Sequence, residues 1–182
     1  MADTWANTLK TELSQGDLIS PQPIVSATTP EKLLKRGATQ KRNVQTWEET
    51  TDWLPQKDGR GHFLASGRKL NAIVLSHDCE IDKDKKVLLV APVLPISTID
   101  DAHRDIVRNR KRYPFMPVPE IENIIPESYI DLRGICFLER DFINQATRLC
   151  SMSETGREDL RFQLIAFITR IPYSQLRIGP SV

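Results

Sequence analysis

A short run of chemically versatile side chains follows an apolar segment near the middle of the chain. The run is His77, Asp78, Cys79 and Glu80, and the apolar segment is 72–75. Functional side chains often emerge at such places, and an imidazole, a thiol and carboxylates could supply a base, a nucleophile and an acid. On an extended strand neighbouring side chains point to opposite faces, so His77 and Cys79 would share one side, away from the two carboxylates. We therefore expect Cys79 to be a small buried side chain and His77 a turn residue, with proton transfer by His77 as the alternative.

The patterns of metal and nucleotide sites are missing from the sequence. His77 and Cys79 would supply two ligands, and the other histidines and cysteines lack the paired spacing of zinc sites. Those others are His62, His103, Cys136 and Cys150. The 8 glycines form neither a dinucleotide-binding nor a phosphate-loop motif, and no serine-hydrolase elbow is present. We therefore expect no metal and no cofactor.

Basic side chains gather in three stretches, although the formal net charge is only +1. The densest, 104–112, is followed by Tyr113 and Phe115, which could stack on unpaired bases. The others are 35–42 and 60–69. If the fold brings these cations to one side, they would bind an acidic protein or the phosphates of RNA by charge, without reading bases. The alternative is that they form an ordinary solvated surface. The residues expected to bind are Arg68, Lys69, Arg108, Arg110, Lys111 and Arg112.

The strands that must position these groups are expected in the middle of the chain. Two apolar runs, 72–75 and 87–91, flank a polar stretch and predict a hairpin at the centre of the fold. Their unbroken apolar character indicates that both faces of this hairpin are covered. A further strand is expected at 16–19, which could lie at an edge, and a third core strand at 130–138.

Helices are expected towards the ends of the chain. The spacing of large apolar residues predicts a short helix over 4–14, and 101–112 can form a helix or helical turn. The most regular pattern is at 155–169, where Thr155 and Glu158 have the spacing of a capping box. One face of this helix is expected to pack on the sheet through Leu160, Leu164, Ile165 and Ile168.

Central strands with helices at the ends favour an α+β fold: a small β-barrel or a twisted, mostly antiparallel sheet with a C-terminal packing helix. The polar stretch 36–61 is expected to be a long loop, either functional or mobile. A chain of 182 residues with 40% hydrophobic side chains suits a single domain over 1–182. The chain shows neither a secretory signal nor a membrane span, and its 3 cysteines favour reduced thiols, so we expect a cytoplasmic protein without a membrane partner.

The order of these motifs resembles the opening of the PemK/MazF-like toxins. The motifs are Gly16-Asp17-Leu18-Ile19, the strand and turn 72–78, and the strand 87–93 that reads Val-Leu-Leu-Val-Ala-Pro-Val. The resemblance covers roughly residues 16–98 and implies a small SH3-like barrel with an exposed loop over an RNA groove. Arg68 or Lys69 stands near the family's arginine, without its proline, and Leu94 replaces its threonine, with Ser97 close by.

Three functions are consistent with these observations. The first is a toxin-like, phage- or plasmid-associated protein that binds RNA or an acidic partner. The second, implied by the resemblance, is a metal-independent endoribonuclease in which Arg68 steadies the phosphate and Ser97 or His77 moves protons. The third is a protein–protein interaction module of a phage or toxin–antitoxin system, with Trp47 and Trp53 as its anchors. A homodimer is compatible with each of them.

Overall fold

The structure is a computed structural model that describes residues 4–6, 9–25, 32–41, 44–50, 62–64, 67–83 and 85–176. The sequence predicted one domain over 1–182; contacts within the chain group it into two compact units. The larger unit is 1–24 with 69–182, and the smaller is 25–68. Each unit is described by itself.

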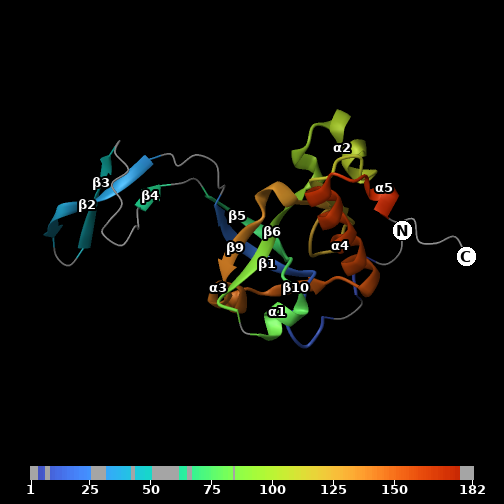
Figure 1. The fold of residues 1–182 in the computed structure, drawn as a ribbon, viewed down its shortest axis with the longest axis horizontal. Coiled ribbons are helices and arrows are strands. Elements are labelled where there is room, and N and C mark those ends of the chain that lie inside the picture. The colour runs from blue at the N-terminus through green and yellow to red at the C-terminus, as the bar shows by residue number, and fades with distance from the viewer. Residues whose placement is uncertain are drawn as a thin grey trace, which may run out of the picture. The chain divides into compact units, whose positions relative to one another are not determined.

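The larger unit is built on a curled antiparallel sheet, a half-barrel, with strand order β10-β1-β5-β6-β8-β7 (Figure 1). The strand β6 is its centre, because its first half pairs with β9 and its second half with β8, while β5 pairs along its other edge. The strands are β1 (Asp17–Val25), β5 (Gly67–Val74), β6 (Val87–Pro95), β7 (Phe115–Val118), β8 (Ser128–Asp131), β9 (Cys136–Glu139) and β10 (Arg148–Ser151).

The predicted central hairpin is confirmed: β5 and β6 pair in an antiparallel register that runs from Asn71↔Val93 to Val74↔Val90. Side chains alternate between two apolar clusters, with Ile73 in the first and Val74 in the second. The first cluster contains residues of α4, and the second contains residues of α1 and α3. Both faces of the hairpin are therefore covered, as its unbroken apolar character indicated.

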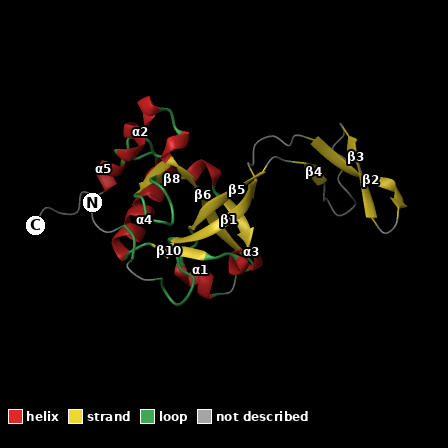
Figure 2. Cartoon of the chain, turned by 180° about the vertical axis from the view of Figure 1, so that it is seen from behind, coloured by secondary structure: helices red, strands yellow, loops and turns green. Residues whose placement is uncertain are grey.

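The helices of the described residues lie around this sheet, and α1 and α3 lie at the end opposite α2 (Figure 2). The α-helices are α1 (Asp78–Asp82), α2 (Asp101–Arg108), α3 (Arg140–Gln145), α4 (Glu154–Thr169) and α5 (Tyr173–Leu176), and the short 3₁₀ turns are η1 (Ile96–Thr98) and η2 (Leu132–Gly134). None of these helices has the length and apolar character that a bilayer crossing requires.

The C-terminal helix α4 packs on the sheet as predicted, but it starts earlier and turns a different face inward. Its N-cap is Ser153 rather than Thr155, and the Ser153 hydroxyl accepts a hydrogen bond from the Gly156 backbone N–H at 3.0 Å. The Thr4 carbonyl lies so close to Gly156 that a Cβ there would overlap it. The buried face is therefore centred on Leu160, whereas Ile165 and Ile168 are 44% and 75% exposed.

Three other expected elements are corrected. The described residues among 4–14 form no helix; Trp5 instead pairs with Met152 in an isolated bridge. The segment 130–138 is two strands rather than one, because η2 separates β8 from β9 and both pair with β6. The strand β1 is interior, between β10 and β5, rather than at an edge.

The smaller unit contains a three-stranded antiparallel sheet with the order β3-β2-β4. Its described strands are β2 (Lys32–Lys41), β3 (Val44–Thr50) and β4 (His62–Leu64). The loop predicted over 36–61 is therefore corrected for the residues that belong to β2 and β3, while 42–43 and 51–61 lie outside the described residues. Polarity suggested a loop, but strands that need not bury a face can also be polar.

Candidate functional site

The structure does not bring His77 and Ser97, two of the predicted catalytic residues, together. His77 is the exposed N-cap of α1, where its Nδ1 accepts a hydrogen bond from the Cys79 N–H at 3.3 Å, and Cys79 is exposed rather than buried. Ser97 lies exposed in η1. Because β5 and β6 are antiparallel, His77 after β5 and Ser97 after β6 lie at opposite ends of the hairpin. Arg68 is exposed at the start of β5, in the smaller unit.

Several of the predicted binding cations are held by carboxylates of the chain. Arg108 donates from Nε and Nη2 to the Glu127 carboxylate at 2.8 and 2.7 Å. It also donates from Nη1 to Asp105 at 3.2 Å. The hydrogen bond from Arg108 lowers the pKa of Glu127, and the bonds to Glu127 and Asp105 raise the pKa of Arg108.

Arg110 has an equally local role. Its backbone is left-handed, with φ 53°, and its guanidinium pairs with Asp159 at 3.0 Å and lies 4.6 Å from the Tyr173 ring centroid. The Tyr173 hydroxyl donates to the same carboxylate at 2.8 Å. Phosphate binding by Arg108 and Arg110 stays a prediction, but these contacts favour their exposed neighbours Lys111 and Arg112, which form no ion pair within the described part of the chain.

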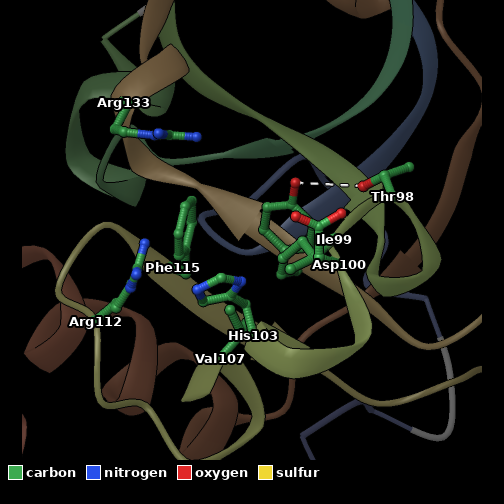
Figure 3. A pocket seen from close by; sticks show the side chains of 9 residues that line it. Thr98, Ile99, Asp100, His103, Val107, Arg112, Phe115 and Arg133 are labelled. Atoms are coloured by element: carbon green, nitrogen blue, oxygen red, sulfur yellow. Dashed lines mark hydrogen bonds between the residues drawn. The ribbon is translucent and has the colours of Figure 1, made fainter. Parts of the chain in front are cut away.

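Arg112 lines a pocket of about 290 Å³ between α2, η1 and the strands β7 and β8 (Figure 3). Its apolar base is part of a small buried cluster that contains Phe115, Tyr129 and Val107. The Tyr129 ring meets the Phe115 ring edge-on, at 5.2 Å between centroids and 80° between planes. The pocket is lined by Thr98, Ile99, Asp100, His103, Val107, Arg112, Phe115, Tyr129 and Arg133.

One wall of this pocket is a guanidinium placed over an aromatic ring. The Arg133 guanidinium carbon lies 4.6 Å from the Phe115 ring centroid. Asp131 fixes it there, because its carboxylate accepts from Arg133 Nε at 2.9 Å and Nη2 at 2.7 Å, and from the Arg133 backbone N–H at 3.0 Å. The hydrogen bond to Asp131 raises the pKa of Arg133. The Arg133 side chain is 61% exposed, so a ligand in the pocket can reach it.

The other wall carries polar groups, and Figure 3 shows Thr98 and Asp100 across the pocket from Arg112 and Arg133. The Thr98 hydroxyl donates to the Pro95 carbonyl at 2.7 Å and lies 3.4 Å from the Tyr129 hydroxyl. Asp100 is the N-cap residue of α2, yet its carboxylate makes no capping hydrogen bond. His103 lies on the first turn of α2, between the two walls. The pocket thus offers cations, an aromatic ring, hydroxyls and a carboxylate.

Sequence reasoning found only part of this pocket. It singled out Arg112 and Phe115, but Asp100, Asp131 and Arg133 were not among the expected binding residues. The alternation of Ile130, Asp131, Leu132 and Arg133 was available as a signal, since it places the two charged residues on one side of an extended chain. Nothing in the sequence placed Asp100 opposite them.

A comparison of the chain with protein-family models finds no match, and a comparison with curated proteins finds no relative. The resemblance to the PemK/MazF-like toxins therefore stays a prediction.

Proposed function

We propose that the larger unit binds single-stranded RNA and that the pocket receives one nucleotide of it. The observation that carries this proposal is the Arg133 guanidinium, which Asp131 holds over Phe115 while 61% of the side chain stays exposed. Unpaired RNA bases stack on guanidinium planes as well as on aromatic rings. A guanidinium fixed before binding loses little side-chain entropy when a base stacks on it. The wall is therefore a prepared stacking surface.

The cations beside this surface suit the RNA backbone. Lys111 and Arg112 are exposed, and Arg112 lines the pocket next to Phe115. An exposed cation without a carboxylate partner can neutralise a phosphate and release its counterion. The pocket volume of about 290 Å³ is near the lower limit of ligand pockets, which suits one unstacked nucleotide rather than a duplex. The resemblance to the PemK/MazF-like toxins points to the same class of ligand.

The other predicted functions have less support in the described residues. An endoribonuclease site could use Ser97 or His77 but not both, because they lie at opposite ends of the hairpin. For an interaction module, Trp47 belongs to β3 of the smaller unit and Trp53 lies outside the described residues. Binding of an acidic protein by Lys111 and Arg112 would use charge alone and leave the stacking surface without a role.

The proposal is tested by fluorescence anisotropy with a labelled seven-nucleotide RNA at several salt concentrations. We expect affinity to fall as salt rises, with a logarithmic slope that decreases by about 0.7 for each phosphate contact removed. The double variant Lys111→Ala, Arg112→Ala should therefore bind several-fold more weakly and with a smaller slope. The matched control is Lys85→Ala, Lys86→Ala, which removes two exposed cations from the α1–β6 connection and should bind like the unaltered protein.

Two results would contradict the proposal. One is an affinity that both double variants reduce equally, because binding would then depend on overall charge. The other is displacement of the RNA by polyglutamate as effectively as by unlabelled RNA, because polyglutamate supplies negative charge without bases and would identify an acidic-partner site.

A further inference from the structure

We infer that the pocket selects guanine, through the carboxylate of Asp100. This inference rests on the proposed RNA binding and adds a base preference to it. It begins from a side chain that does not do what its position favours. Aspartate at a helix N-cap ordinarily accepts a hydrogen bond from a backbone N–H of the first turn, but the Asp100 side chain makes no such bond and lines the pocket instead.

The Asp100 carboxylate is also not used by the nearest arginine. Arg104 pairs with Asp101 at 2.6 Å and donates to the backbone carbonyls of Ile99 at 3.0 Å and Ser97 at 3.2 Å. Asp100 forms no ion pair or side-chain hydrogen bond within the described residues. The exposed Asp100 carboxylate therefore lines the pocket with two acceptor oxygens that no donor among the described residues uses.

The chemistry of the four bases decides which of them such an acceptor prefers. An ionised carboxylate accepts hydrogen bonds through both oxygens and donates none. Guanine presents two adjacent donors, N1–H and the 2-amino group, on its Watson–Crick edge. Adenine, cytosine and uracil each place an acceptor beside every donor on that edge, which would set a lone pair against the carboxylate. Only guanine can therefore form the paired, charge-assisted hydrogen bonds.

The arrangement of the walls is compatible with this pairing. Arg133 and Arg112 lie on one side of the pocket and Asp100 and Thr98 on the other (Figure 3). A base stacked on Arg133 would have Asp100 and Thr98 on the facing wall of the pocket, which Arg112 also lines. The Thr98 hydroxyl donates to the Pro95 carbonyl, so the Tyr129 hydroxyl, 3.4 Å from it, is the group that could donate to the guanine O6.

The test compares seven-nucleotide RNAs that have uridine at every position except the fourth, which is guanosine, adenosine, cytidine, uridine or inosine. We expect the guanosine strand to bind at least about fivefold more tightly than the adenosine strand, because a bidentate pair gives about 1–3 kcal/mol of discrimination. Inosine, which lacks the 2-amino group, should lie between them. Asp100→Asn should remove the preference while the salt dependence of binding remains. Asp101→Asn, the matched control at the next residue, should keep it.

The outcomes separate this inference from the proposed function. Equal affinity for all five strands would overturn guanine selection, and a preference that survives in Asp100→Asn would overturn the role of Asp100 in it; both outcomes leave RNA binding in place. Absence of binding to any strand would overturn both. Competition with free GMP identifies the source of the guanine: displacement at the concentration of the oligonucleotide itself would assign the pocket to a free nucleotide instead of RNA.

Discussion

Replacing Asp131 by asparagine separates a prepared stacking surface from simple attraction between charges. The Asp131 side chain is only 13% exposed and holds Arg133 through two side-chain hydrogen bonds of 2.9 and 2.7 Å. Asparagine can still accept the backbone N–H of Arg133 and so retains the cap of η2. It loses the bidentate ion pair that keeps the guanidinium over Phe115. The variant therefore loosens the Arg133 side chain while it leaves the local backbone largely unchanged.

Simple charge attraction and a prepared stacking surface predict opposite changes in the RNA affinity of Asp131→Asn. For an RNA phosphate at a separation of about 8 Å from the Asp131 carboxylate, the repulsion between the two charges in water is about 0.5 kcal/mol. Salt at physiological strength reduces this to about 0.2 kcal/mol, so charge alone predicts binding about 1.4-fold tighter in Asp131→Asn. Ordering a released arginine costs about 0.5–1.5 kcal/mol, which predicts binding about two- to twelvefold weaker. The ordering effect is the larger one, so we expect a net loss.

The measurement is the anisotropy titration with the guanosine-containing strand at 0.05 M and 0.15 M salt, chosen as two points on the screening curve. Urea unfolding of the same variant checks that the population remains folded. Weaker binding at both salt concentrations supports a stacking role for Arg133. Tighter binding of Asp131→Asn, with unchanged stability, would refute the reasoning, because it would show that Arg133 needs no partner to act.

Three further predictions concern stability, and each is measured by urea unfolding. Leu160→Ala should lower the free energy of unfolding by about 2–5 kcal/mol, because Leu160 is 0% exposed. The exposed control Ile168→Ala should change it by less than about 0.5 kcal/mol. Equal losses would show that the inward face of α4 is wrongly assigned. The hydrogen bond with Arg108 lowers the pKa of Glu127 below its ordinary value of 4.5. The contribution of this bond to the free energy of unfolding is therefore present above pH 4.5 and is lost as the pH falls below it. An acid dependence of stability that is the same in Arg108→Ala would contradict this. Burial, with the charge of Asp17 as a smaller cause, raises the pKa of Cys150 from 9.0 to about 12. The contribution of this thiol to stability is therefore full below pH 9.0 and decreases as the pH rises towards about 12. Cys150→Ala should lose less stability over this range, and an identical alkaline loss would rule out the thiol as its source.

The central hairpin could be predicted from the sequence because its signal is local and strong. A continuous apolar run is favourable only where both faces are buried, and Ile73 and Val74 are both 0% exposed. The helix α4 could be predicted too, but its inward face could not. Arg157 and Gln163 are buried on that face, and a hydrophobic pattern counts both as polar. The cost of burying the Arg157 charge is offset by a hydrogen bond to Asp78 at 3.1 Å. These two residues lie far apart in the chain.

The candidate site was only partly predictable for the same reason. A cluster of cations is visible in a sequence, but its free charge depends on which carboxylates the fold brings to it. Arg108 forms an ion pair with Glu127, which lies just before β8, and Arg110 forms an ion pair with Asp159 of α4. The aromatic residue Phe115 could be expected beside the cations. The guanidinium over it comes from η2, a turn that the pattern at 130–138 had merged into a single strand.

The most direct test of the account is to map the RNA-binding surface of the whole protein by NMR. A ¹⁵N-labelled chain is titrated with the guanosine-containing seven-nucleotide strand, and the change of each backbone amide signal is recorded. The account predicts that the largest changes fall on 98–103, 111–115 and 129–133, the segments that surround the pocket. Changes confined to other segments, or no changes at RNA concentrations that saturate the anisotropy signal, would contradict it.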